Sequence, residues 1–160
     1  MSIFSSLIAL SKRAILGLEF VTPVVDLAAR LWLASVIWKS GLTKVTSWDS
    51  TLSLFNYVYH VPLLPPDVAA VLSAGVELGG AALLALGLGA RVGATALFVL
   101  NFVAVISYPD LSDAGRMDHF FWGLLLLIIL VHGAGKLSAD HFIRKAFFRG
   151  GANRTLAPHP

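Results

Sequence analysis

Apolar residues gather in four long segments, and each is bounded by proline, glycine or charged residues, as helix ends usually are. A helix of about 20 mostly apolar residues is long enough to cross the hydrocarbon core of a bilayer. The pattern therefore predicts an all-α membrane protein, a four-transmembrane-helix bundle. The four helices are expected at about residues 24–42, 67–88, 91–108 and 118–135.

The first twenty residues follow a different pattern. Apolar side chains recur at helical spacing from Ile3 to Leu18, but serines and charges interrupt them. We interpret residues 1–20 as an amphipathic interfacial helix lying on the cytoplasmic surface. A secretory signal is the competing interpretation, although its positive charge should precede the apolar run, whereas Lys12 and Arg13 follow it.

The rest of the chain is predicted to form one domain and a tail. Residues 21–140 are expected to form the transmembrane domain, and residues 141–160 a basic cytoplasmic tail that is disordered from about Gly150. The longest connection, from about Thr43 to Pro66, has room for a short surface helix. Trp48, Tyr57 and Tyr59 fit an aromatic belt near the outer surface, and Trp122 is expected to mark the same interface.

Composition supports a membrane location. Hydrophobic residues make up 57% of the 160 residues and charged residues 13%, whereas soluble domains carry about 25% charged residues. The mean hydropathy is +0.79. The net charge of +3 forms no basic stripe, which argues against nucleic acid as a partner. The chain has no cysteine, so it lacks thiol chemistry of its own, and no spacing of ligands predicts a metal site.

The distribution of Lys and Arg predicts an orientation. One side of the predicted helices carries eight of them, namely Lys12, Arg13, Arg91, Lys136, Arg144, Lys145, Arg149 and Arg154. The opposite side carries two, Lys44 and Arg116. Cytoplasmic loops are enriched in Lys and Arg. We therefore expect a multi-pass protein of the cytoplasmic (inner) membrane with both termini in the cytoplasm.

Four polar residues fall inside the predicted spans. Glu77 lies at the middle of its helix, and Arg30 lies about four residues from the middle of its own. Asn101 and His132 fall at comparable depths. A charge at the bilayer centre costs roughly 2.5–3.5 kcal/mol on insertion scales, so these side chains should turn inward and share a layer. Counted from the helix centres, an Arg30–Glu77 pair is within reach.

Two interpretations of this polar layer remain open. It is either a hydrogen-bonded network that fixes helix register, or a site for a quinone headgroup, a proton or a small anion. His119 is expected near the outer surface, where a metal site with Asp118 or His60 has no supporting spacing.

Three ordered motifs between Val25 and Asp140 resemble the DoxX family. The first is Arg30 followed by Gly41 and Lys44; the second runs from Glu77 to Arg91. The third is the pattern G-x-G-x-x-S-x-D that begins at Gly133. The residues that match the motifs are Arg30, Gly41, Lys44, Glu77, Gly79, Gly80, Gly87, Arg91, Gly133, Gly135, Ser138 and Asp140.

The resemblance implies a four-helix bundle in the cytoplasmic membrane and leaves the reaction open. Relatives include the membrane subunit of thiosulfate:quinone oxidoreductase, and a mycobacterial DoxX-like protein assembles with a sulfurtransferase and a superoxide dismutase. The first hypothesis is therefore a quinone-interacting or redox-associated membrane subunit, without a covalently bound cofactor, whose electrons come from a partner or a bound substrate such as thiosulfate.

Two other functions stay open at this point. In the second hypothesis the chain is a non-enzymatic anchor that gathers soluble oxidative-stress, sulfur or metal-handling proteins through its basic C-terminal segment. A small transporter is the third hypothesis, and it would need an oligomer to form a pore. Gly75, Gly79 and Gly80 offer a face on which two copies could associate.

Overall fold

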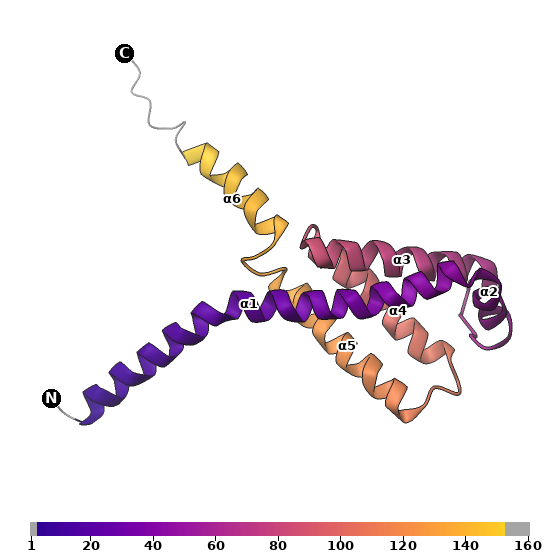
Figure 1. Ribbon diagram of the computed structural model, residues 1–160, viewed down its shortest axis with the longest axis horizontal. Coiled ribbons are helices and arrows are strands. Elements are labelled where there is room, and N and C mark those ends of the chain that lie inside the picture. The colour runs from indigo at the N-terminus through magenta and orange to yellow at the C-terminus, as the bar shows by residue number, and fades with distance from the viewer. Residues whose placement is uncertain (1–2, 153–160) are drawn as a thin grey trace, which may run out of the picture.

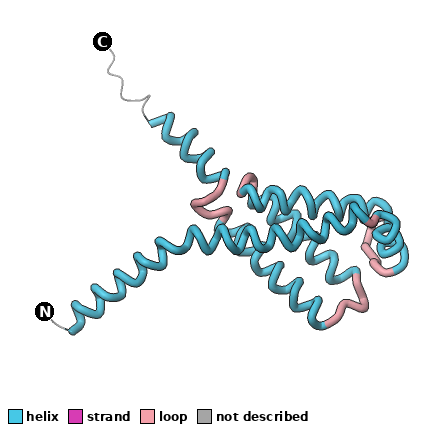
Figure 2. The backbone as a smooth tube through the Cα atoms, viewed as in Figure 1, coloured by secondary structure: helices cyan, strands magenta, loops and turns pink. Residues whose placement is uncertain are grey.

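The computed structural model describes residues 3–152, and these residues form six helices and no strand. Figure 1 shows a bundle from which both ends of the chain extend, and Figure 2 shows that the connections between helices are short. The helices are α1 (Ile3–Thr46), α2 (Trp48–Tyr57), α3 (Pro66–Leu86), α4 (Ala90–Ser107), α5 (Asp113–His132) and α6 (Ala139–Ala152).

Four of these helices, α1, α3, α4 and α5, are long and apolar enough to cross a membrane. The predicted all-α bundle with four such helices is confirmed. Helix α3 packs on both α1 and α4, and α4 packs on α5, whereas α1 and α5 contact each other only slightly. Two ends of the bundle can be distinguished. The loop end holds α2 and the 108–112 connection, and the terminal end holds the 87–89 turn and the 133–138 loop.

The helix boundaries follow the hydropathy pattern closely for α3 and α4, which begin within one residue of the expected positions. Helix α5 differs, because it begins at Asp113 instead of about residue 118. Ser112 explains the earlier start: its side chain accepts a hydrogen bond from the Gly115 amide, and Asp113 adds a negative charge to the first turn. The extra turn places His119 deeper in the bundle than the sequence predicts.

Helix α1 is continuous over 44 residues, so the structure does not separate an interfacial helix from the first predicted span. Pro23, expected to begin a new helix, lies inside α1. At 1.5 Å per residue α1 is about 66 Å long, roughly twice the thickness of a bilayer core. Its N-terminal part leaves the bundle, and apolar side chains such as Leu18 and Phe20 are exposed there (Figure 1).

The connection between α1 and α3 contains the expected short helix, α2. Phe55 of α2 is buried against Ala69 and Ala70 of α3. The following segment is tied to the end of α4, since the His60 amide donates to the Ser107 carbonyl at 2.8 Å. Helix α2 and residues 58–64 therefore cover the loop end of the bundle.

Small residues set the relative positions of the long helices. A Cβ atom at Gly41 would lie 3.1 Å from the Glu77 Cβ, so α1 touches α3 at the level of Glu77. A Cβ at Gly80 would lie 2.6 Å from the Leu97 side chain, whereas one at Gly79 would meet no atom within 4 Å. Gly41 and Gly80 thus permit close helix contacts, and Gly79 belongs to an open face.

Helix α6 occupies much of the segment predicted to be a tail. It leaves the bundle at the terminal end and extends to Ala152 (Figure 1). The helix therefore includes residues 150–152, the first of those expected to be disordered. Residues 153–160, the remainder of that prediction, lie outside the described residues.

Candidate functional site

A cavity of about 450 Å³ lies toward the loop end, between α1, α3, α4 and α5, with α2 and the following segment closing it. Most of its wall is aliphatic or aromatic. The polar side chains in the wall are Ser40, Lys44, Tyr59, Ser73, Glu77, Asn101, Ser107, Tyr108 and His119. A largely apolar cavity of this size with a few polar groups is typical of a small-molecule site.

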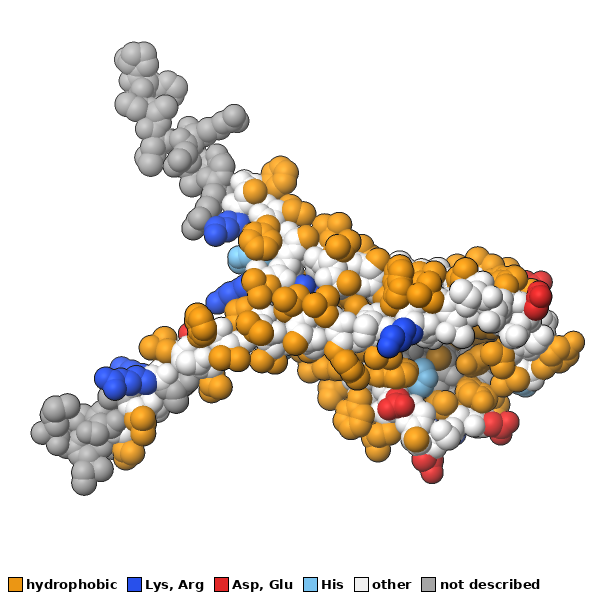
Figure 3. Space-filling model, viewed as in Figure 1, with side chains coloured by type: hydrophobic (Ala, Val, Ile, Leu, Met, Phe, Trp, Pro, Cys, Tyr) orange, Lys and Arg blue, Asp and Glu red, His pale blue; other side chains and the backbone are white. Residues whose placement is uncertain are grey.

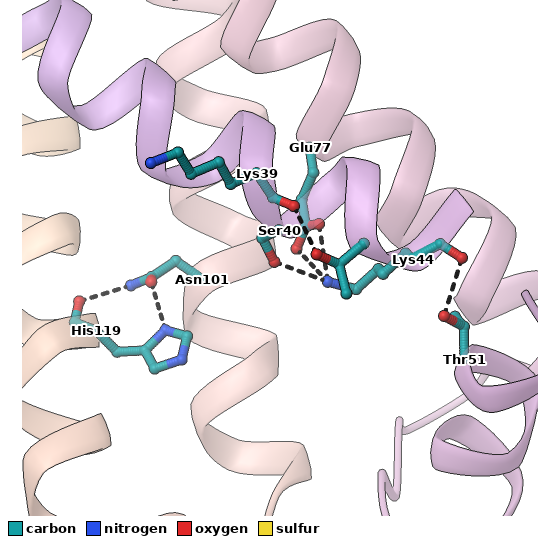
Figure 4. Close-up of polar contacts among 8 residues, drawn as sticks. Lys39, Ser40, Lys44, Thr51, Glu77, Asn101 and His119 are labelled. Carbon is teal, nitrogen blue, oxygen red and sulfur yellow. Dashed lines mark hydrogen bonds and ion pairs between the residues drawn. The ribbon is translucent and has the colours of Figure 1, made fainter. Parts of the chain in front are cut away.

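Lys44 and Glu77 form an ion pair in this wall (Figure 4). The Lys44 ammonium lies 2.8 Å from each carboxylate oxygen of Glu77 and 3.1 Å from the Ser40 hydroxyl. Both charged side chains are mostly buried, 18% and 13% exposed. The expected Arg30–Glu77 pair is therefore wrong, because Lys44 occupies the position beside Glu77 that Arg30 was predicted to fill.

Asn101 and His119 form a second polar pair, on α4 and α5 (Figure 4). The Asn101 amide nitrogen donates to the His119 carbonyl at 2.9 Å, and the Asn101 amide oxygen lies 2.7 Å from His119 Nδ1. Because the amide oxygen can only accept, Nδ1 of His119 carries the proton. The other ring nitrogen, Nε2, has no hydrogen-bond partner among the described residues, so it is available as a site for a proton or a ligand.

Ser107, at the end of α4, also lines the cavity. Its hydroxyl is buried, the residue being 1% exposed, and it has no hydrogen-bond partner among the described residues. A buried polar atom without a partner is rare and calls for an explanation. A ligand in the cavity would supply the missing partner.

Two aromatic residues that were predicted to lie at the outer interface line the cavity. Tyr59 packs against Phe55 and Tyr108, with ring centroids 5.0 and 5.3 Å away, and Trp122 packs edge-on against His119. Burial, together with Tyr108 and Glu77, raises the pKa of Tyr59 above its usual value. The Tyr59 hydroxyl is therefore protonated at neutral pH and can donate a hydrogen bond.

Arg30 lies at the terminal end, away from this cavity. It is 2% exposed and donates to the backbone carbonyls of Ala134 and Leu137, at 2.5 and 2.8 Å. These bonds hold the 133–138 loop against α1. Arg30 acts here as a structural cation that satisfies buried carbonyl groups.

Asp140 joins the same region to α4. Its carboxylate accepts from the amides of Gly89 and Ala90 at 2.8 and 3.1 Å, and its own amide donates to the Gly87 carbonyl at 2.9 Å. A carboxylate from a distant segment thus caps the N-terminus of α4, where negative charge is favoured. Gly87 has a φ of +64°, and a Cβ there would strike Arg30 and Ser138.

The remaining residues of the third motif lie in this region too. Gly133 and Gly135 have φ values of +86° and +77°, which only glycine adopts readily. Ser138 donates to the Gly135 carbonyl at 2.7 Å, and Arg91 donates to the Val131 carbonyl at 3.1 Å. The DoxX-like motifs therefore divide between two places, with Arg30 and the glycine-rich turns at the terminal end and Lys44 and Glu77 at the cavity.

The single polar layer predicted from Arg30, Glu77, Asn101 and His132 does not form. Glu77 and Asn101 line one cavity, Arg30 lies at the terminal end, and His132 is exposed with its ring 3.2 Å from the Ile128 carbonyl. Of the four predicted residues, two line the cavity. The sequence did not indicate that Lys44 would pair with Glu77 or that His119 would pair with Asn101. The cap at Ser112 is the signal that could have placed His119 at the depth of Asn101.

The chain is similar to a known family and to a bacterial protein. The DoxX family model matches residues 25–109, which include the first two motifs and most of the cavity wall. An uncharacterized protein of Haemophilus influenzae is 30% identical over 128 residues, a match that covers 76% of this chain and 84% of the relative. No solved structure matches the chain.

Proposed function

This chain belongs to the DoxX family of membrane proteins, and from that premise we propose that its cavity binds the headgroup of a membrane quinone. The chain would then act as the membrane subunit of a quinone-linked redox system. The observation that carries the proposal is the Ser107 hydroxyl, which has no partner among the described residues and lies in a largely apolar cavity that also holds His119. Ser107 and His119 are the two groups we assign to direct contact with the ligand.

The size and chemistry of the cavity are consistent with a quinone. Its volume of about 450 Å³ falls within the range of small-molecule sites, and its aliphatic and aromatic wall matches an apolar ring. The surface is hollowed below α1, beside the α4–α5 pair, and a histidine side chain is visible there (Figure 3). A ligand dissolved in the bilayer could enter on this side, where α1 and α5 make few contacts.

The polar groups have separable roles in this proposal. Bound quinone supplies two-electron chemistry that also takes up two protons. The Ser107 hydroxyl would donate a hydrogen bond to a ligand oxygen, and His119 would hold or release a proton at Nε2 while Asn101 fixes its Nδ1. The Lys44 ammonium already has three acceptors, Glu77 Oε1 and Oε2 and Ser40 Oγ, so we assign it to fixing the position of the Glu77 carboxylate.

Electrons would reach the ligand from outside this chain. The sequence has no cysteine to carry them, and the proposal therefore assigns the donor to a soluble or membrane partner in a redox or stress complex. Enzymatic activity is a property of that assembly in this proposal.

Quinone binding tests the site. Ser107→Ala should weaken binding of a short-chain benzoquinone by about five- to tenfold, the value of one hydrogen bond of about 1–1.4 kcal/mol. The variant should leave the stability of the protein unchanged, because the Ser107 hydroxyl bonds no described protein group. Binding is measured by titration of the full chain in detergent with decylubiquinone, following tryptophan fluorescence.

Ser53→Ala provides the matched control, since Ser53 is exposed on α2 and bonds only within its own helix. This control should bind the quinone as the wild type does. The proposal fails if the wild type shows no saturable binding, or if Ser107→Ala and Ser53→Ala bind equally tightly.

We also propose that the terminal end faces the cytoplasm, on the eight-to-two distribution of Lys and Arg. The absence of native cysteine makes this testable with single cysteines. In intact cells, an impermeant maleimide should label Ser112→Cys at the loop end and should label Lys136→Cys only after the membrane is opened. The reverse pattern would assign the cavity to the cytoplasmic half of the bilayer.

A further inference from the structure

A second, strongly polar cleft lies at the terminal end, outside the proposed quinone site. Its volume is about 660 Å³, and it is bounded by the N-terminal part of α1, the start of α4, the 133–138 loop and α6. Figure 3 shows this region as a hollow between the two arms that extend from the bundle, with Lys, Arg and His side chains around it. The cleft does not share a lining residue with the apolar cavity.

The charges around the cleft are separated by sign. Arg91, Lys136 and Arg144 contribute positive charge from α4, the loop and α6, while Glu19 and Asp26 contribute negative charge from α1. Among the described residues none of these five groups lies within 4.0 Å of an opposite charge. The cleft therefore presents a basic wall and an acidic wall whose charges are not neutralised by each other.

Asp140, the third acid of the cleft, is already engaged. Its two oxygens accept from the amides that begin α4. The basic wall is consequently left with three cations and two histidines, His132 and His141, as donors for an anion. Arg91 keeps donors for a ligand, since only one of its nitrogens bonds the protein.

The position of the cleft points to the membrane surface. The apolar helix α5 ends at His132, and Val131, Val92 and Leu137 expose apolar side chains next to the cleft. Basic pockets at the ends of transmembrane helices suit phospholipid headgroups, and arginine matches the geometry of phosphate. An acidic wall opposite the cations adds a place for an ammonium group.

We propose that this cleft binds a phosphate-bearing ligand, with the phosphate on Arg91, Lys136 and Arg144 and an attached amine facing Glu19 and Asp26. The headgroup of phosphatidylethanolamine has this arrangement of charges. Free phosphate shares the anionic chemistry but has no amine. The proposal is independent of the quinone site.

The experiment uses the full chain in detergent and native mass spectrometry with short-chain phosphatidylethanolamine and phosphatidylglycerol. We expect wild type to retain phosphatidylethanolamine preferentially. Lys136→Gln/Arg144→Gln should weaken binding of both lipids at least fivefold, because it removes two of the three cations. Asp26→Asn should weaken phosphatidylethanolamine alone. Neither set of changes removes a hydrogen bond that the structure shows, so folding should be retained.

Lys39→Gln is the matched control, because Lys39 is an exposed lysine of α1 that lies thirteen residues, or about 20 Å along the helix, from Asp26 of the cleft. A calorimetric titration with inorganic phosphate separates the sources of the phosphate. Phosphate binding that is lost in the double variant, together with no retention of either lipid, would support the basic wall, identify free phosphate as its ligand and overturn the contact with an amine. Lipid binding that is equal in the double variant and in Lys39→Gln, or no binding of either lipid or phosphate, would overturn the proposal.

Discussion

Glu77→Gln should destabilise the bundle by about 3–5 kcal/mol, the usual cost of removing one partner from a buried ion pair. Lys44 would then face a neutral amide, with its charge largely buried between α1 and α3. Lys44→Met should cost a similar amount, because it leaves the Glu77 carboxylate without a counter-ion. The double variant Lys44→Met/Glu77→Gln should cost clearly less than the sum of the two single variants.

A double-mutant cycle measures this coupling, with unfolding of the purified protein followed by circular dichroism in mixed detergents. Lys39→Met is the control, because Lys39 is exposed and has no carboxylate within 4.0 Å among the described residues. It should change stability by less than about 0.5 kcal/mol. Additive losses from Lys44→Met and Glu77→Gln would show that the ion pair contributes no coupling energy and would contradict the prediction.

The four long helices were predictable because a bilayer demands long apolar segments, and their composition shows this directly. The depth of single residues was less predictable. Placing each helix centre at the same level put Arg30 beside Glu77, but the contact between Gly41 and α3 shows that Gly41 is level with Glu77. Arg30 is eleven residues from Gly41, or about 16 Å along α1. The lengths of the helices give no information about this shift of α1 along α3.

The shift has a physical cause in the loop end. The first turns of α3 extend beyond α1 and pack on α2, where Phe55 contacts Ala69 and Ala70. A helix of ten residues such as α2 has too few apolar positions to be recognised as part of the bundle, so its covering role could not be inferred. The same covering segment brings Tyr59 into the wall of the cavity, which the sequence did not indicate.

The motifs do not indicate which region of the structure each of their residues occupies. Lys44 and Arg30 both appear in the first motif, yet one lines the cavity and the other holds the terminal loop. The motif does not distinguish these roles. Arg30 bonds backbone carbonyls, and because every residue has one, the sequence does not show which of them Arg30 contacts. Asp140 presents the same difficulty, since its partners are backbone amides fifty residues away.

Arg30→Gln should release the terminal end of the bundle, with a loss of about 3–5 kcal/mol. Arg30 donates two charge-assisted hydrogen bonds, a buried one to the Ala134 carbonyl and a partly buried one to the Leu137 carbonyl, each contributing about 1.5–3 kcal/mol. A shorter neutral amide cannot reach both carbonyls. The loop that Arg30 holds leads directly to Asp140, which caps α4. Loss of Arg30 should therefore also expose the amides of Gly89 and Ala90.

Hydrogen exchange followed by mass spectrometry measures this loosening of the terminal end in separate peptides. In Arg30→Gln, exchange should rise at least tenfold in peptides that cover residues 87–91 and 134–141, and it should stay unchanged around Glu77. Arg116→Gln is the control, because Arg116 is an exposed arginine at the opposite end that also donates to a backbone carbonyl, that of Leu111. Uniform acceleration across the chain would indicate global unfolding, and unchanged exchange at residues 134–141 would show that Arg30 does not hold the loop. Arg30→Lys, which keeps the charge and can satisfy one carbonyl, should fall between wild type and Arg30→Gln.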